Sequence, residues 1–214
     1  MQDDVAIIVV AGGGGTRFGG AKQFAALGAS TVLDLSIQTA MCITSHVVAV
    51  VPADADWTPP EGCVRVDGGA TRSASTRCGL AAVTSHPAIV VVHDGARPLC
   101  TIDIYNSVIA AVRAGADAAV PAIAVSDTVK RVDGDRVVAT VPRDNLVTVQ
   151  TPQAFRSDVL RRAHGVADDA TDDAGTVERD GGVVKVVAGD PRNLKITVPD
   201  DLAIAAALLR EIGE

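Results

Sequence analysis

The chain has 214 residues with 19 basic and 26 acidic side chains, which gives a formal net charge of −7. An acidic protein repels phosphate backbones at long range, so we expect neither nucleic acid as a main partner nor anchoring on a membrane surface by basic charge. Hydrophobic residues make up 48% and charged residues 21% of the chain, which indicates a globular protein and excludes a disordered one. The length favours a single domain over residues 1–214.

The cysteines stand singly along the chain, with no C-x-x-C pair, at Cys42, Cys63, Cys78 and Cys100. This spacing favours neither a zinc site nor a disulfide framework, and it suits a reducing cytoplasm. No apolar run approaches the ~20 residues needed to cross a bilayer. We therefore predict a cytoplasmic protein without a membrane segment.

Short β-branched runs alternate with helical patterns along most of the chain. Strands are predicted, in chain order, at Val5–Val10, Val47–Val51, Val64–Val66, Ile89–His93, Ala118–Ala122 and Val183–Val187. Helices are predicted between them at Thr31–Ala40, Ser73–Val83, Ile102–Ala114, Asp158–Gly165 and Asp201–Glu211. Several strands are apolar without alternation, as in strands covered on both faces. The pattern predicts an α/β fold with a single doubly wound, mostly parallel sheet.

The segment Thr128–Thr140 departs from this alternation. It carries Asp133-Gly134, a strong signal for a hairpin turn, between strands that are mostly polar or charged on one side. Because an isolated two-stranded hairpin is marginally stable, another surface must cover it. The spacing leaves two interpretations open: an edge hairpin on the same sheet, or an arm that packs on a second subunit.

The first strand ends in a glycine-rich run, Ala11–Gln23, with six glycines. Ligands bind beyond the carboxyl ends of strands in an open parallel sheet, and glycines allow a close approach. Neither the dinucleotide fingerprint G-x-G-x-x-G nor the P-loop G-x-x-x-x-G-K-[ST] fits the run. A glycine loop with two cations, Arg17 and Lys22, indicates polyphosphate binding through a different loop geometry. The alternative is a flexible turn.

Asp94 follows another predicted strand, in the string VHDGARP. A carboxylate at the tip of a strand can hold Mg²⁺ beside phosphates, and the alternative is an Asx turn. His93 lies on the apolar strand, which favours packing over a role as a base. We expect His46, His86 and His164 at the surface or at helix ends. Lys195 lies beside a short strand and could equally be a solvated lysine.

Six strings in register resemble the 2-C-methyl-D-erythritol 4-phosphate cytidylyltransferase family: AGGGGTRFGGAKQ, VHDGARP, DTVKR, TPQAF, TDDA and NLKIT. The resemblance runs from about Val5 to Leu209. It implies a Rossmann-like nucleotidyltransferase domain with a protruding arm at about residues 127–146 that makes a homodimer. It also implies a reaction that joins CTP to methylerythritol 4-phosphate with release of pyrophosphate, in the non-mevalonate isoprenoid pathway, with Mg²⁺ or another hard divalent cation.

The resemblance also implies roles for individual residues. The CTP triphosphate would lie on Ala11, Gly12, Gly13, Gly14 and Gly15, and the reacting phosphates near Arg17, Lys22 and Lys195. Ser75 would lie near the cytosine and ribose. The residues implied for the sugar phosphate are Asp94, Arg97, Thr128, Arg143, Thr151 and Lys195, with Asp94 also near the nucleotide and the metal, and with Thr128 and Arg143 reaching a neighbouring subunit.

Three positions depart from the family pattern. Ala21 replaces a common proline, TDDAGT replaces the frequent TDEAS, and GGATRSAS lacks an acidic residue before its arginine. The third departure leaves the contacts to cytosine open. Two other functions are compatible with the strings: a ribitol 5-phosphate cytidylyltransferase, and a nucleotide-binding regulatory protein without activity.

Overall fold

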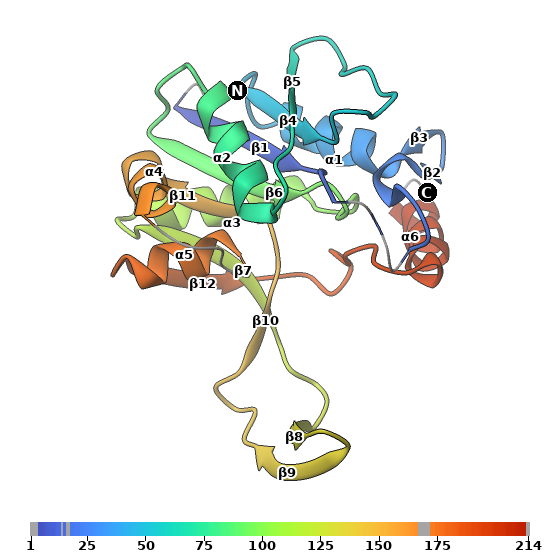
Figure 1. Ribbon diagram of the computed structural model, residues 1–214, viewed down its shortest axis with the longest axis vertical. Coiled ribbons are helices and arrows are strands. Elements are labelled where there is room, and N and C mark those ends of the chain that lie inside the picture. The colour runs from blue at the N-terminus through green and yellow to red at the C-terminus, as the bar shows by residue number, and fades with distance from the viewer. Residues whose placement is uncertain (1–3, 14, 16–17, 167–171, 213–214) are drawn as a thin grey trace.

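A mixed sheet of eight strands forms the centre of the computed structural model, which describes residues 4–13, 15, 18–166 and 172–212 (Figure 1). The strand order is β10-β7-β11-β6-β1-β4-β5, and β12 pairs with β7. The pairs β1–β6, β1–β4, β4–β5 and β7–β12 are parallel, whereas β10 and β11 run antiparallel to their neighbours. The predicted α/β fold with a mostly parallel sheet is confirmed. The strands are β1 (Val5–Val10), β4 (Val47–Val51), β5 (Cys63–Asp67), β6 (Ile89–Asp94), β7 (Ala118–Ala124), β10 (Val147–Val149), β11 (Gln153–Arg156) and β12 (Val184–Ala188).

Helices cover both faces of this sheet, which is why the central strands are apolar throughout. Successive side chains of a strand point to opposite faces, so Val5, Ile7 and Val9 enter one core while Ala6 and Ile8 enter the other. The first core is closed by α1 (Val32–Met41) and α3 (Ile102–Arg113). The second is closed by α2 (Arg72–Ala82), α4 (Ser157–Val166) and α5 (Asp173–Arg179).

A smaller third core lies beside the main sheet. It joins α6 (Pro199–Ile212) to the short hairpin of β2 (Ala26–Leu27) and β3 (Ser30–Thr31) through Leu27, Ile196 and Ala205. The three-residue helix η1 (Lys22–Phe24) precedes β2. This core anchors the ends of the two segments that carry Lys22 and Lys195.

The sequence pattern did not predict β11, and this strand matters most for the position of the site. It has four residues, begins with a buried glutamine and follows Pro152, so it lacks the apolar run that marks the parallel strands. It inserts antiparallel between β6 and β7. Thr151 is thereby placed beside the end of β6.

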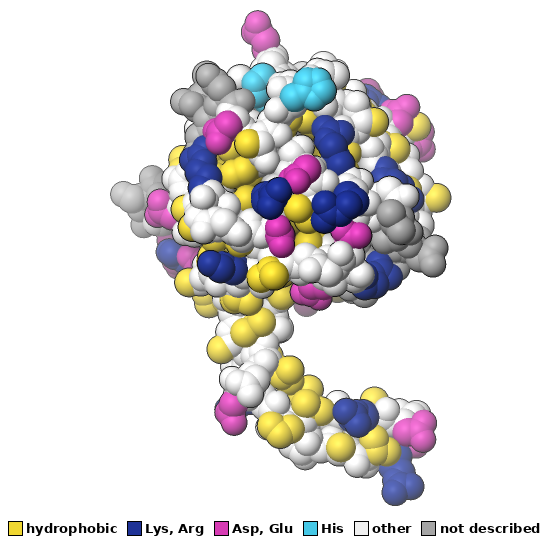
Figure 2. All heavy atoms as spheres, turned by 90° about the vertical axis from the view of Figure 1, so that its left-hand side faces the viewer, with side chains coloured by type: hydrophobic (Ala, Val, Ile, Leu, Met, Phe, Trp, Pro, Cys, Tyr) yellow, Lys and Arg dark blue, Asp and Glu magenta, His cyan; other side chains and the backbone are white. Residues whose placement is uncertain are grey.

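The hairpin of β8 (Val129–Asp133) and β9 (Arg136–Val141) forms a separate two-stranded sheet. Gly134 adopts a positive φ of 59° in the turn, as the Asp-Gly signal predicts. The hairpin projects away from the main sheet at the end of two extended segments (Figure 1), and hydrophobic side chains lie at the surface of this projection (Figure 2). Of the two open interpretations, the edge hairpin is therefore wrong, because β8 and β9 pair only with each other among the described residues.

Among the described residues, no helix combines the length and the apolar character that a membrane span needs. The four cysteines are free thiols.

Candidate active site

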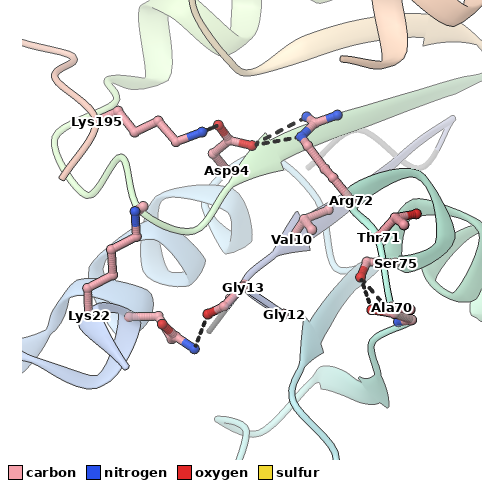
Figure 3. Close-up of a pocket in the computed structure, with 14 residues that line it drawn as sticks. Val10, Gly12, Gly13, Lys22, Ala70, Thr71, Arg72, Ser75, Asp94 and Lys195 are labelled. Atoms are coloured by element: carbon pink, nitrogen blue, oxygen red, sulfur yellow. Dashed lines mark hydrogen bonds and ion pairs between the residues drawn. The ribbon is translucent and has the colours of Figure 1, made fainter. Parts of the chain in front are cut away.

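A pocket of about 280 Å³ opens at the carboxyl ends of β1 and β6, the edge where the sequence predicted a ligand (Figure 3). The first residues of α2 and the segment before α6 complete its walls. The predicted site residues that line it are Ala11, Gly12, Gly13, Lys22, Ser75, Asp94 and Lys195. These residues come from four distant parts of the chain.

The glycine loop presents backbone to the pocket. A Cβ at Gly12 would come within 3.1 Å of the Ser75 hydroxyl, so the loop passes closer to α2 than an alanine would allow without displacement. The Gln23 amide donates a hydrogen bond to the Gly13 carbonyl oxygen at 3.4 Å. Gly15 adopts a positive φ of 62°, and a Cβ at this position would clash with the Gly20 carbonyl oxygen, so only glycine fits there. Gly15 itself is not on the pocket wall.

The turn that starts α2 forms another wall of the pocket. The Thr71 hydroxyl caps the helix by accepting a hydrogen bond from the Ala74 amide at 3.1 Å. The buried Ser75 hydroxyl accepts from the Gly69 amide at 3.2 Å and is 3.3 Å from the Gly69 carbonyl. Ser75 therefore holds the turn in shape, which keeps Gly69 against the pocket.

Asp94 is the only carboxylate among the described residues of the pocket wall, and two cations hold it. Its Oδ1 lies 3.3 Å from Arg72 Nη2, and its Oδ2 lies 2.6 Å from Lys195 Nζ (Figure 3). The side chain of Asp94 is 11% exposed, against 25% for Arg72 and 41% for Lys195. Burial opposes the charge on Asp94, but the nearby Arg72 and Lys195 outweigh it and hold the pKa of the carboxyl far below its usual range.

Thr151 fixes the end of β6 from behind the pocket. Its hydroxyl accepts a hydrogen bond from the Asp94 amide at 2.9 Å and lies 3.2 Å from His93 Nδ1. Burial lowers the pKa of His93 to about 4, so its ring is neutral near pH 7. His93 Nε2 lies 3.2 Å from the Arg97 carbonyl. His93 thus has the packing role predicted for it, with its ring bonded within the fold.

Arg97 supports the wall that carries Lys195. Its Nη1 donates to the Asn193 carbonyl oxygen at 2.6 Å, and the Asn193 amide donates to the Thr151 carbonyl at 2.9 Å. Arg97 and Asn193 are both buried. The resemblance implied that Arg97 supports the loop of the sugar-phosphate site, and its guanidinium holds the segment before α6 in place.

The whole chain is similar to proteins of one known family. The sequence profile of the 2-C-methyl-D-erythritol 4-phosphate cytidylyltransferase family matches residues 5–211. The chain belongs to this family. The enzyme of that name from Symbiobacterium thermophilum is 42% identical over 99% of this chain and 95% of its own length. The one from Frankia casuarinae is 44% identical over 96% of this chain and 81% of its own.

Two further similarities concern length and structure. A bifunctional IspD/IspF enzyme from Dinoroseobacter shibae is 44% identical over 99% of this chain, which spans 55% of that longer protein. The crystal structure of the 2-C-methyl-D-erythritol 4-phosphate cytidylyltransferase of Thermus thermophilus superimposes with a TM-score of 0.87 at 34% identity, over 98% of this chain and 100% of the other. The family and the nucleotidyltransferase class predicted from the six strings are thereby confirmed.

Several predicted cytidylyltransferase site residues do not line the pocket. Thr128 and Arg143 lie exposed at the base of the arm, where the Arg143 guanidinium donates to the Ser126 carbonyl. A single copy of the chain does not bring them to the pocket. Gly14 and Arg17 lie outside the described residues.

Arg72 is the pocket residue that the sequence analysis missed. Besides contacting Asp94, its Nη1 lies 2.6 Å from Asp173 Oδ2. The signal in the sequence was a cation in the first turn of a helix that follows a strand ending at the same sheet edge. His164 lies in the last turn of α4, which agrees with the expected place at a helix end. It is also buried, and its Nε2 lies 3.0 Å from Asp173 Oδ1.

Proposed function

We propose that this chain transfers the cytidylyl group of CTP to the phosphate of 2-C-methyl-D-erythritol 4-phosphate and releases pyrophosphate. The observation that carries the proposal is the convergence of Lys22, Arg72 and Lys195 on one pocket walled by glycine backbone. Such a wall accepts phosphates closely, and the cations neutralise their charge. Family membership supports the choice of substrates.

The chemistry requires no protein base. The attacking group is a phosphate monoester, whose second pKa of ~6 leaves it largely ionised at pH 7. Anionic groups must instead be brought into line and their charge stabilised in the transition state. Lys22 and Lys195 reach the pocket from separate segments of the chain (Figure 3), so two cations are available to the attacking and the leaving phosphates. His93 is buried and bonded within the fold, so it plays no part in proton transfer.

Mg²⁺ fits this site as an ion held mainly by the substrate. The described residues contain no cluster of three or more His, Cys, Asp or Glu side chains that could hold a metal. Protein sites for Mg²⁺ commonly use one or two carboxylates together with substrate phosphates, and Asp94 offers one carboxylate beside the glycine loop. We propose that Asp94 holds the ion with the triphosphate. When bound, Mg²⁺ supplies charge neutralisation at the phosphoryl oxygens.

We further propose that the protein is a homodimer whose arm, residues 127–146, reaches the pocket of the neighbouring copy. The arm exposes Val132, Val137 and Val138, which is unfavourable unless another surface covers them. A second copy would also bring Thr128 and Arg143 to the sugar phosphate. We expect Arg143→Ala to raise KM for the sugar phosphate while KM for CTP stays unchanged. A monomeric mass by light scattering, or an unchanged KM, would contradict the arm's role.

A cytoplasmic location is part of the same proposal. Four thiols stay unpaired, as a reducing compartment allows, and two of them, Cys63 and Cys100, are buried.

The deciding experiment is pyrophosphate release from CTP and Mg²⁺, with methylerythritol 4-phosphate and ribitol 5-phosphate compared side by side. Turnover with the first substrate alone supports the proposal. Preference for ribitol 5-phosphate would keep the chemistry and change the substrate. Binding of CTP without turnover on either substrate would favour the regulatory interpretation.

A further inference from the structure

Three side chains form a connected chain from the interior to the pocket. They are His164 in the last turn of α4, Asp173 at the start of α5 and Arg72 at the start of α2. His164 Nε2 lies 3.0 Å from Asp173 Oδ1, and Arg72 Nη1 lies 2.6 Å from Asp173 Oδ2. Only Arg72 lines the pocket. The other two lie behind it and cannot touch a substrate.

Asp173 has no exposed surface and uses each carboxylate oxygen for a different partner. Burial raises the pKa of a carboxyl, but here the hydrogen bond from His164 and the charge of Arg72 outweigh it, and the pKa of Asp173 is lowered. Asp173 is therefore a buried anion. Such a charge is costly without partners, so the position of Arg72 is tied to it.

His164 completes this arrangement as a donor. An ionised Asp173 can only accept hydrogen bonds, so we assign the hydrogen of this contact to His164 Nε2. His164 Nδ1 is buried and has no hydrogen-bond partner among the described residues. The ring therefore serves Asp173 through Nε2 alone.

The main sheet anchors Asp173 in turn. The buried Gln153 on β11 donates to Asp172 Oδ2 at 2.8 Å and accepts from the Ala174 amide at 3.2 Å. These two bonds flank Asp173 in sequence and fix the first turn of α5 to β11. The carboxylate is thus held by the same sheet that carries Asp94.

We propose that Asp173 and His164 are positioning residues for the guanidinium of Arg72. Arg72 is held between two carboxylates, with Nη1 on Asp173 and with Nε and Nη2 at 3.4 and 3.3 Å from Asp94 Oδ1. Asp173 keeps this long side chain directed along the pocket wall, where it contributes charge to the binding of phosphate oxygens. The inference rests on the proposed function, because it assigns Arg72 to the nucleotide's anionic groups.

The test is a double-mutant cycle on the full-length protein, measured both as kcat/KM for CTP and as CTP affinity by calorimetry. A hydrogen bond between charged groups contributes enough that we expect Asp173→Asn to lower both quantities by roughly 10-fold or more. In the Arg72→Ala background the same substitution should change them by less than about twofold, because the group that it positions is gone. If Asp173→Asn lowers kcat/KM and CTP affinity by the same factor in the wild type and in Arg72→Ala, the two residues act independently and the proposal is wrong.

The histidine provides a second route that does not alter the buried charge. His164→Leu removes the donor at similar volume, and we expect a smaller loss in the same direction. His164→Gln places an amide donor near the position of Nε2 and should restore most of the CTP affinity. Equal affinities for the Leu and Gln variants would contradict the role of His164. This pair also decides the matter if Asp173→Asn does not fold.

Arg162→Gln is the matched control, because the exposed Arg162–Asp180 pair also joins α4 to α5, at 2.8 Å, but lies away from the pocket. It should leave CTP affinity within about twofold of the wild type. A comparable loss in this variant would indicate that helix docking, rather than Arg72, is what matters. A wild type that binds CTP without pyrophosphate release would refute the proposed function, while the cycle in CTP affinity would still decide the positioning role.

Discussion

Replacing Lys195 by methionine separates a role in the reaction from a role in stability. The Lys195–Asp94 ion pair is short, at 2.6 Å, but the lysine side chain is 41% exposed. Water screens such a pair, so its loss should lower the free energy of unfolding by no more than ~1 kcal/mol. A cation ~4 Å from a phosphoryl oxygen, at an effective dielectric constant of ~20, interacts by ~4 kcal/mol. Because water entering the site replaces part of this, we expect kcat to fall about 100-fold, the scale of losing one preorganised contact.

The assay is pyrophosphate release at saturating CTP and methylerythritol 4-phosphate, with urea unfolding of the same samples. Arg192→Met is a suitable control, since Arg192 forms a similar 2.9 Å pair with Asp190 in the same segment and does not line the pocket. It should keep kcat within about twofold. A Lys195→Met enzyme with more than about a third of the wild-type kcat, or an equal loss in Arg192→Met, would refute the reasoning.

Three further tests concern other parts of the structure. Lys22→Ala should lower kcat by about 100-fold, and on the basis of the sequence alone so should Arg17→Ala. Lys185 is exposed, and Lys185→Ala should leave kcat unchanged. Near-normal turnover in Lys22→Ala would show that Lys22 does not act in the reaction. The lowered pKa of Asp94 means that its charge stabilises the fold above the ordinary carboxyl pKa of ~4 and that this contribution fades as the pH falls. The stability difference between the wild type and Asp94→Asn, from urea unfolding at pH 7, 5 and 3, should therefore shrink on acidification, and a difference that grows would contradict the ion-pair account. In Gly79→Ala the new Cβ would lie 2.5 Å from Ile8 Cγ2, so thermal unfolding should show that the free energy of unfolding falls by ~1–3 kcal/mol. Gly165→Ala, whose new Cβ would have nothing within 4 Å, should not be destabilised. Equal melting temperatures of the two variants would indicate that the core adapts to the methyl group.

Much of the fold could be predicted from local patterns. The parallel strands and every helix of the described residues longer than seven residues appear in the sequence within a few residues of their bounds, because a strand buried on both faces is a continuous apolar run and a helix repeats every 3.6 residues. The seven-residue helix α5 was not predicted. β11 could not be predicted in this way. Its four residues take their conformation from β6 and β7 on either side rather than from their own composition.

The residues of the site also differ in how far the sequence could predict them. The glycine loop, Lys22 and Asp94 were recognisable because each lies in a distinctive string at the end of a strand. Arg72 lies in a helix start of ordinary composition, and nothing near it in the sequence marks its partners. Both of its carboxylates are distant along the chain, with Asp94 22 residues and Asp173 101 residues away.

The sequence by itself determined the layers of this protein, the edge of the sheet where a ligand binds, and the family, because these depend on periodicity and on strings of neighbouring residues. Only the tertiary structure decided that the hairpin leaves the main sheet, that His164 is buried, and that Asp94 is shared between Arg72 and Lys195. The physical reason is that a buried charge is stable only with its partners. Those partners are brought together by the crossover connections between parallel strands rather than by proximity along the chain.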